Sequence, residues 1–551
     1  MAELFWFSLV ALLVIVALTS SAPVKGQAVD GTLLGIVTDS SGAAVAGAQV
    51  SIKETNTSVV RTTLTNESGN YTFPTLTPGT YDVSVEKVGF KKAIRQAVEV
   101  LVDATVRVDL QMQPGVVTET VIVTAEVPLL QTDRSDTGRK LVAQQLEELP
   151  ISYNNHNVQG LVNLVPGTTR AFRPHSQFFN PQDSLSTQVN GNSRLANNLQ
   201  LEGIDDNERT GLLQVYIPPM EVLQTVDVTT SNYEAELGRA GGAVTNLLLK
   251  SGTNSFHGAV YAFNKVSALQ ALSFFQHVPG FQKPVTVYNY DGLNVGGPIF
   301  KNKLFFFGDF LRISDHRGQF DTFTLPTADF RAGDFTKAPT KIYDPTTGDT
   351  ADCLPGGNPT LCGTGRTQFV ASANPSNPNY NPACTSGTGC PNMIPVARFD
   401  PISLKLLALV PLPNIAGAGF ASNFFQTSMF IKTTDSFDAK IDYNPNSANH
   451  ISGRLSFQKF VTTDPPAFGQ AGGPHGGGFQ GTGIQKTWVP GVNWDHIFSP
   501  RLIMELRVGV ERYRNDAQQS DYGKNDSANI GIPGVNTGAF TSGLTSVDIG
   551  N

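Results

Sequence analysis

Residues 502–511, LIMELRVGVE, show the pattern on which the predicted fold rests. Successive side chains of a β-strand point to opposite faces, so one face of this strand is apolar and carries Leu502, Met504, Leu506, Val508 and Val510. The other face carries the charged side chains of Glu505, Arg507 and Glu511. Such a strand separates an apolar environment from a polar one, as in a membrane barrel or in the sheet of a soluble protein.

The same alternation recurs through the second half of the chain. In residues 431–443, apolar side chains alternate with Asp438, Lys440 and Asp442, and in residues 448–460 they alternate with His450, Arg454 and Gln458. We expect seven strands in all, at residues 256–264, 289–298, 303–313, 431–443, 448–460, 485–498 and 501–513.

The connections between these predicted strands alternate between short and long. The short ones lie at 301–302, 444–449 and 499–500, and the long ones at 265–288, 314–430, 461–484 and from 514 onward. Transmembrane barrels have this asymmetry, with tight periplasmic turns and long outer loops. We therefore predict an incomplete transmembrane antiparallel β-barrel over residues 256–551, because seven strands cannot close and an odd number ends the chain outside.

The N-terminus carries an export signal. Residues 4–18, LFWFSLVALLVIVAL, form an apolar run of the length of a signal-peptide core, shorter than the roughly 20 residues of a membrane-spanning helix. The small residues at 20–22 (SSA) or 26–28 (GQA) offer a cleavage site. Glu3 precedes the run without any Lys or Arg, so a retained helix is the alternative. We predict a signal peptide over residues 1–28.

Composition narrows the possible partners. The chain has 15% charged residues and a net charge of -7, with 53 Gly, 34 Pro and 34 Phe among its 551 residues. Low charge with many turn-forming and aromatic residues favours a mainly β protein with long loops. The charge is small for this length and no basic patch stands out, so we expect no nucleic-acid partner.

The four cysteines all lie in one stretch rich in Gly, Pro and Asn. In an exported protein an even, local set predicts disulfides, and the pairing that needs least rearrangement joins Cys353 to Cys362 and Cys384 to Cys390. Zinc is the rival interpretation, but no CxxC motif is present and no His lies close in sequence.

Residues 29–115 have short alternating segments separated by turn signals, as expected of a β-sandwich. This segment resembles the carboxypeptidase regulatory-like domain, which implies a small Greek-key sandwich without catalytic residues of its own. The resemblance rests on Gly35, Val37, Asp39, Gly42, Val45, Gly47, Ala48, Gly69, Tyr71, Phe73, Leu76, Pro78, Gly79, Tyr81, Gly89 and Phe90. A docking module and a simple spacer are both open interpretations.

A β-branched run follows in the segment 116–126. Consecutive Thr, Val and Ile favour an extended strand whose unpaired edge a partner can extend. The run resembles the TonB box of TonB-dependent receptors, which implies that the TonB energy-transducing complex is a partner. The candidate residues are Glu119, Thr120, Val121, Ile122, Val123, Thr124 and Ala125.

Residues 127–255 resemble the α+β plug domain of the same receptors. Helices are predicted in LVAQQLEELPI (141–151) and NVQGLVNLVPGTT (157–169), each ending at a proline. The string YEAELGRAGGAVTNLLLKSGTNSFHG (233–258) resembles the exit of the plug into the barrel. We expect its glycines to permit close packing and positive φ, at Gly238, Gly241 and Gly242.

The strings GLNVGGPIFKNKLFFFGDF (292–310) and SALQALSFF (267–275) resemble the Oar-like branch of TonB-dependent receptors. This resemblance implies a barrel of about twenty-two strands around the plug, so the chain is expected to be the N-terminal part of a longer receptor. It also implies an outer-membrane location, with sandwich and plug on the periplasmic side, contact with outer-membrane lipid, and energy-dependent uptake of an unknown extracellular substrate. A surface adhesion or interaction protein is the alternative.

Enzyme chemistry finds no support in the sequence. The eight histidines form no HExxH pair, and the Gly-rich stretch around His475 has no Walker lysine. We therefore predict no catalytic residues, no cofactor and no metal. The oxygens of residues 205–208 (DDNE) are assigned to a solvated loop rather than to calcium. The predicted lumen charges Lys440, Arg454 and Arg507 are assigned to mutual pairs rather than to a substrate site.

Overall fold

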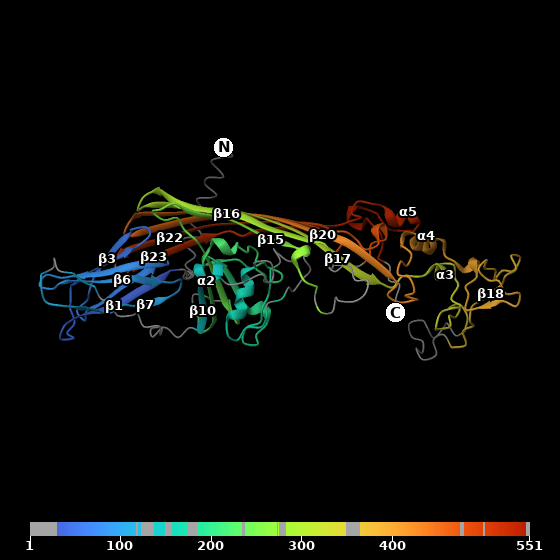
Figure 1. The fold of residues 1–551 in the computed structure, drawn as a ribbon, viewed down its shortest axis with the longest axis horizontal. Coiled ribbons are helices and arrows are strands. Elements are labelled where there is room, and N and C mark those ends of the chain that lie inside the picture. The colour runs from blue at the N-terminus through green and yellow to red at the C-terminus, as the bar shows by residue number, and fades with distance from the viewer. Residues whose placement is uncertain are drawn as a thin grey trace, which may run out of the picture.

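The computed structural model describes residues 30–546 except for 117–119, 123–136, 149–156, 171, 173–177, 179–183, 234–236, 238, 273, 275–282, 349–363, 474–478, 500 and 501. The predicted signal peptide, residues 1–28, lies outside this range. The described chain is mainly β and falls into a sandwich, a plug and a large antiparallel sheet (Figure 1). Among the described residues, no helix has both the length and the apolar character that crossing a bilayer requires.

The N-terminal sandwich packs two sheets around an apolar core. One sheet has the order β3-β2-β5-β6-β9, from strands Val60–Leu64, Gln49–Glu54, Gly79–Glu86, Lys92–Val100 and Thr120–Ile122. In the other, β4 (Asn70–Leu76), β7 (Thr105–Arg107) and β8 (Leu110–Met112) all pair with β1 (Gly31–Asp39). Alternate residues of β1 are buried, as its pattern predicts, and Leu33 and Val37 are fully buried in the core.

The plug is built on a five-stranded sheet of order β10-β13-β14-β11-β12. Its strands are Thr137–Val142, Leu223–Ser231, Val244–Leu249, Asn198–Leu201 and Ile204–Asp205. Every residue of β14 is buried, because it lies at the centre of this sheet. The plug core also includes Phe307 and Val489 from the large sheet, so the two units share one apolar interior.

The helices of the plug are shorter than the sequence suggests. The helix α2 spans Ala143–Glu148, within the first predicted helix. The second predicted helix is instead a 3-10 helix, Val158–Leu164, which Asn157 caps at its start. Four buried positions in this short turn, beginning with Val158, anchor it to the plug core.

The large sheet has the order β15-β16-β17-β20-β21-β22-β23, and β24 also pairs with β22. The strands span His257–Val266, Thr286–Phe300, Leu304–Phe323, Phe424–Asn446, Asn449–Asp464, Gly481–Ser499, Leu502–Gly509 and Arg512–Gln519. They fall on the seven predicted segments, and the last of these is broken between β23 and β24. Several strands are longer than predicted at the end away from the tight turns. For example, β17 and β20 stay paired as far as Phe323 and Phe424.

The two faces of the large sheet meet different environments. On β20, Phe437, Ile441 and Tyr443 are at least 41% exposed, whereas Asp438, Lys440 and Asp442 on the opposite face are buried. The buried face packs against the plug, which lies beneath the strands (Figure 1). An apolar outer face with a polar inner face is the arrangement of a transmembrane barrel wall.

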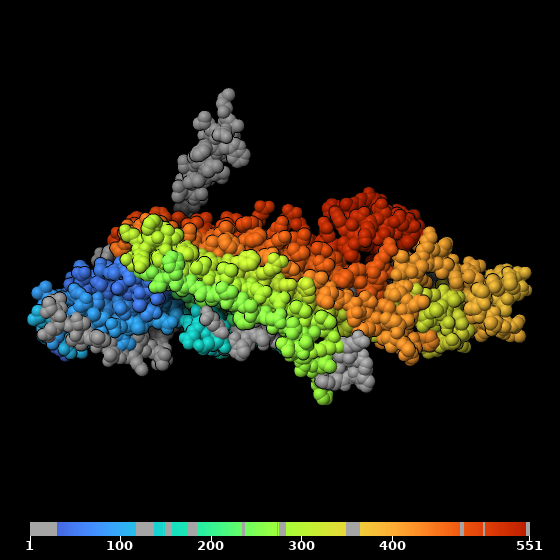
Figure 2. Space-filling model, turned by 45° about the horizontal axis from the view of Figure 1, so that its top comes forward, coloured from blue at the N-terminus to red at the C-terminus, as the bar shows by residue number. Residues whose placement is uncertain are grey.

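The space-filling view shows what lies at the two ends of the wall strands (Figure 2). The sandwich lies at one end of the strands, and the segment between β17 and β20 extends beyond the other end. We call this segment, residues 324–423, the outer lobe. It contains the helices α3 (Ala328–Arg331) and α4 (Pro401–Leu409) and the short hairpin β18–β19 (Val370–Ala371 and Cys390–Pro391).

The glycine prediction at the plug exit is correct only for the close packing of Gly242. Gly242 approaches Asn197 so closely that a side chain would collide with its amide. Gly241 and Gly242 do not have positive φ, because both precede the extended strand β14. Gly238 lies outside the described residues.

Candidate functional site

A buried glutamate joins the plug to the barrel wall. Glu202 follows strand β11 of the plug, and its carboxylate accepts a hydrogen bond from Lys440 Nζ of strand β20. Arg454 of strand β21 places its Nε 3.6 Å from the same carboxylate. Its Nη2 donates a hydrogen bond to Leu201 O at 2.9 Å. All three charged side chains are at most 6% exposed. The plug therefore supplies one anion between two cations of the wall.

A second buried contact lies at Tyr216 of the plug. Its hydroxyl lies 3.1 Å from Ser436 Oγ and donates to the carboxylate of Asp438, both on β20. Burial, and next the charge of Asp438, raise the pKa of Tyr216 far above its usual range, so the phenol stays protonated. This hydrogen bond to a buried carboxylate adds a polar connection between plug and wall.

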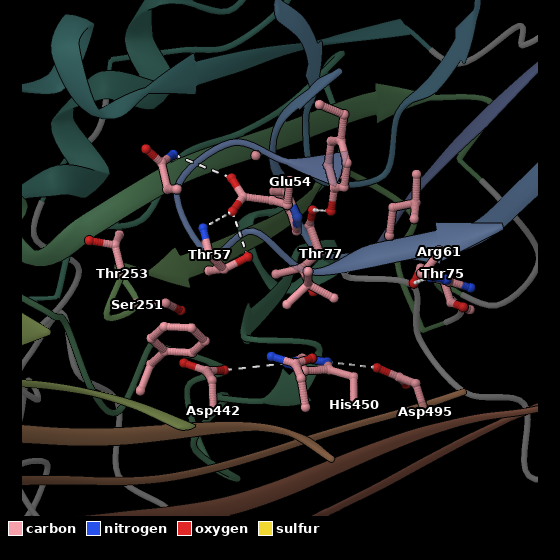
Figure 3. A pocket seen from close by; sticks show the side chains of 18 of the residues that line it. Glu54, Thr57, Arg61, Thr75, Thr77, Ser251, Thr253, Asp442, His450 and Asp495 are labelled. Atoms are coloured by element: carbon pink, nitrogen blue, oxygen red, sulfur yellow. Dashed lines mark hydrogen bonds and ion pairs between the residues drawn. The ribbon is translucent and has the colours of Figure 1, made fainter. Parts of the chain in front are cut away.

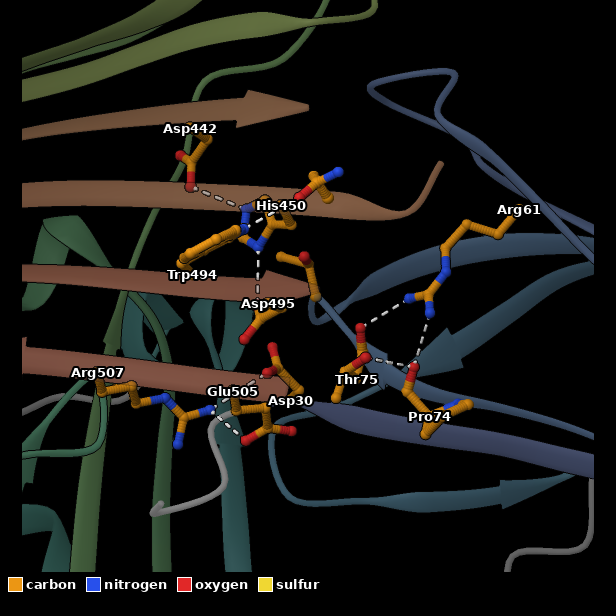
Figure 4. Close-up of polar contacts among 12 residues, drawn as sticks. Asp30, Arg61, Pro74, Thr75, Asp442, His450, Trp494, Asp495, Glu505 and Arg507 are labelled. Atoms are coloured by element: carbon orange, nitrogen blue, oxygen red, sulfur yellow. Dashed lines mark hydrogen bonds and ion pairs between the residues drawn. The ribbon is translucent and has the colours of Figure 1, made fainter. Parts of the chain in front are cut away.

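A row of ion pairs lines the end of the strands that faces the sandwich (Figure 4). His450 on β21 lies between two carboxylates, with Nδ1 3.2 Å from Asp495 Oδ2 and Nε2 3.5 Å from Asp442 Oδ1. Arg507 on β23 lies 3.2 Å from both Asp30 Oδ2 and Glu505 Oε2. Asp30 immediately precedes the first sandwich strand, so this ion pair attaches the sandwich to the wall.

Burial, and next the negative charge of Asp495, raise the pKa of Asp30 to about 6. The three carboxylates of Asp30, Asp495 and Glu505 bring oxygens within 4.8 Å of one another, a spacing that could suit a metal ion. Arg507 contacts two of them and His450 the third. We therefore assign the three carboxylates to ion pairs.

A cavity of about 260 Å³ lies where sandwich, plug and wall meet (Figure 3). The sandwich contributes Glu54 and Arg61, the plug exit contributes Thr253, and the wall contributes Asp442 and His450. Close by, Gln224 of the plug donates to Pro78 O of the sandwich at 3.1 Å, and Asn254 N donates to Asn56 O at 3.0 Å. The three units therefore contact one another at a single junction.

The candidate TonB box lies partly within the described chain. Thr120, Val121 and Ile122 form β9, which pairs in parallel with Lys92, Ala93 and Ile94 of β6. The sequence predicts an unpaired edge here, whereas the structure pairs one edge of β9 with the sandwich. Glu119 and residues 123–125 lie outside the described residues.

The candidate disulfides lie in the outer lobe. Cys384 and Cys390 are joined, with Cα atoms 5.7 Å apart, beside the hairpin β18–β19. Cys353 and Cys362 lie outside the described residues. In the same lobe, Nη1 and Nη2 of Arg398 donate to the carboxylate of Asp344, at 2.6 and 2.7 Å.

Several site residues cannot be identified from their sequence context alone. Among the predicted lumen cations, Arg507 pairs with Glu505 of the wall and also with Asp30 beside the sandwich. Lys440 and Arg454 instead lie beside Glu202 of the plug. The expectation of a solvated loop at residues 205–208 is wrong for Asp206. This carboxylate is fully buried and accepts hydrogen bonds from Tyr216 N and Gln214 Nε2, both at 2.9 Å. The sequence signal that comes nearest to indicating these buried acids is that Glu202 and Asp206 lie close to the apolar residues Leu201 and Ile204.

The two-sided wall, with its polar face packed against a plug, defines the class, an outer-membrane β-barrel protein. The family model described as "Outer membrane beta barrel domain" matches residues 248–551, more than half of the chain. The chain belongs to this family. The model described as "Carboxypeptidase regulatory-like domain" matches residues 32–113, the region of the sandwich.

A curated relative is the TonB-dependent transporter Oar of Myxococcus xanthus, which is 26% identical over 290 residues. The match covers 51% of this chain and 26% of the relative, so it spans about a quarter of that protein. The chain is thus a homologue of a TonB-dependent transporter, and its location is the outer membrane.

The chain is similar in part to two solved structures, at low identity. The outer membrane transporter YddB from Escherichia coli is 12% identical with a TM-score of 0.38, and the match covers 68% of this chain and 38% of that one. The siderophore receptor PirA from Acinetobacter baumannii is 13% identical with a TM-score of 0.30, and the match covers 72% of this chain and 50% of that one.

Proposed function

We propose that this chain is the plug-bearing part of a receptor for TonB-dependent active uptake of an extracellular substrate. In this proposal, residues 119–125 engage the periplasmic domain of TonB, and the proton gradient of the inner membrane supplies the work through that partner. The receptor performs no covalent chemistry and needs no cofactor of its own. Its task is to bind the substrate, to hold it and to release it inward.

The observation that carries the proposal is the position of β10. In the part of the plug that the structure describes, this strand is the first after the candidate box, and it forms the outer edge of the plug sheet by pairing with β13. A pull on the preceding chain would load the pairing of β10 with β13 first. Among the contacts that then resist movement of the plug are the buried polar contacts of Glu202 and Tyr216 with the wall.

The experiment replaces residues 119–125 by a Gly/Ser segment of equal length in the full-length gene. We expect the variant to lose energy-dependent accumulation of medium components and to assemble normally in the outer membrane. Untargeted mass spectrometry of cell extracts measures the accumulation. A matched control replaces seven residues of the outer lobe, 413–419, in the same way. Unchanged accumulation with the box replaced would overturn the proposed uptake mechanism.

A second candidate function is surface adhesion or interaction. The outer lobe favours it, because this segment of 324–423 carries its own disulfide and the Arg398–Asp344 pair beyond the ends of the strands. In this case, replacing the box would leave cell attachment unchanged, whereas deleting the outer lobe would abolish it.

A further inference from the structure

The edge of the sandwich sheet already holds a strand from the candidate box. Strand β9 pairs in parallel with β6 through three residue pairs, Lys92 with Thr120, Ala93 with Val121, and Ile94 with Ile122. The pairing extends the antiparallel sheet β3-β2-β5-β6 by one strand. The β6 edge thus binds an extended, β-branched segment by strand addition.

This pairing has the features of a reversible contact. It involves three residue pairs, whereas β5 and β6 share six. It is also parallel in an otherwise antiparallel sheet, and parallel pairing is slightly less stable per residue. The described side chains of the sandwich core all belong to residues that precede β9.

The same three residues lie within the first part of the segment, residues 119–125, that would add to a sheet of TonB. A strand presents its backbone groups alternately to its two edges, so a three-residue strand has few groups for each. The β6 edge already uses one of these sets. A partner sheet that binds the whole segment as one of its own strands must therefore displace residues 120–122 from the β6 edge.

We propose that the β6 edge of the sandwich is a strand-binding surface that holds residues 120–122 and competes with the periplasmic domain of TonB for them. The inference rests on the proposed function, because it assumes that this segment is the TonB box. The sandwich then sets how readily the receptor is engaged, and engagement frees the β6 edge.

Amide hydrogen exchange tests the competition directly. The probe is the purified periplasmic C-terminal domain of TonB, added to the full chain in detergent. Expected is at least tenfold faster exchange, when the probe is bound, at those amides of residues 92–94 that face β9, because they lose their partner strand, whereas the amides that face β5 keep theirs. Unchanged or slower exchange at 92–94, together with new protection at 120–122, would show that TonB adds to the free edge of β9 and would overturn the proposal.

A reversible lock gives a second measurement. Lys92 and Thr120 are directly opposite each other, so a disulfide in the Lys92→Cys/Thr120→Cys variant would hold β9 on β6. Expected is at least tenfold weaker binding of the probe after oxidation, restored by reduction. The control is Lys92→Cys alone, which also loses the 2.7 Å ion pair between Lys92 and Glu86. Equal affinity in the oxidised and reduced double variant would overturn the proposal.

A third variant separates this proposal from the proposed function. Val121→Pro removes a backbone N–H at the centre of β9 and blocks strand addition to any partner. If this variant binds the probe like the wild type, the segment is not the TonB box and both proposals fail. If it loses binding while the lock and the exchange show no effect, only the competition is overturned.

Discussion

Glu202 of the plug and Lys440 of the barrel wall form an ion pair with side chains only 3% and 6% exposed. The two residues are 238 positions apart in the chain, and Arg454 lies on the other side of the same carboxylate. A buried charge is tolerated only when it is paired, so this cluster ties the position of the plug to the wall.

We expect Glu202→Gln to destabilise the plug within the barrel by about 3–5 kcal/mol, because it removes the buried anion that the plug supplies to two buried cations of the wall. Limited proteolysis of outer-membrane preparations across a urea series would report release of the plug. The matched control is Glu148→Gln, which changes an exposed glutamate of the same unit. Equal urea midpoints for the two variants would contradict the role of Glu202.

Docking of the sandwich is expected to weaken as the pH rises from about 4 to 7. The pKa of Asp30 is about 6 in the folded chain, above its ordinary value of 3.8, so the folded state binds the proton more tightly. The stabilisation is therefore complete below the ordinary pKa and is lost as the pH rises through about 6. The groups around Asp30 are Asp495, Glu505, Arg507, His450 and Arg61.

Proteolytic release of the sandwich, followed from pH 4 to pH 7.5, measures this effect. The Asp30→Asn variant should lose the part of the pH dependence that belongs to Asp30, since its amide does not titrate. A variant with the same pH profile as the wild type would show that other groups set it.

Gly252→Ala should impair barrel assembly, because Gly252 lies where the chain passes from plug to wall. A Cβ atom at this position would lie 2.6 Å from Gly297 O and 2.9 Å from Phe306 N, which are backbone atoms of β16 and β17. Overpacking of this kind typically costs about 1–3 kcal/mol. Heat-modifiable migration in gels measures assembly. Gly453→Ala is the matched control, since a Cβ there meets no atom within 4 Å.

Cys384→Ser should loosen the outer lobe without affecting the wall. The disulfide to Cys390 closes a loop with a sequence separation of 6, and a cross-link of that size contributes about 2 kcal/mol through the unfolded state. We expect faster protease cleavage within residues 324–423 and unchanged membrane assembly. Cleavage at the wild-type rate would show that the Arg398–Asp344 pair and its neighbours hold the lobe alone.

Local pattern was sufficient to predict the strands of the wall. Alternation in β20, β21 and β23 predicts both the strands and their two faces, because the side-chain period of a strand is two regardless of what packs against it. The turns at 301–302 and 444–449 predict which strands are neighbours. Strand β3 was not predicted, because the Val-Arg-Thr-Thr-Leu segment at 60–64 has no buried face and its pattern is weak.

The candidate site depended on long-range contacts that no local pattern contains. Sequence by itself determined that Lys440, Arg454 and Arg507 would face the polar side of the wall. Only the tertiary structure decided that Glu202, Leu201 and Asp30 would be their partners, since these lie in separate units hundreds of residues away. For the same reason, β-branched composition determined that residues 120–122 would be extended, and the neighbouring β6 edge decided where they pair.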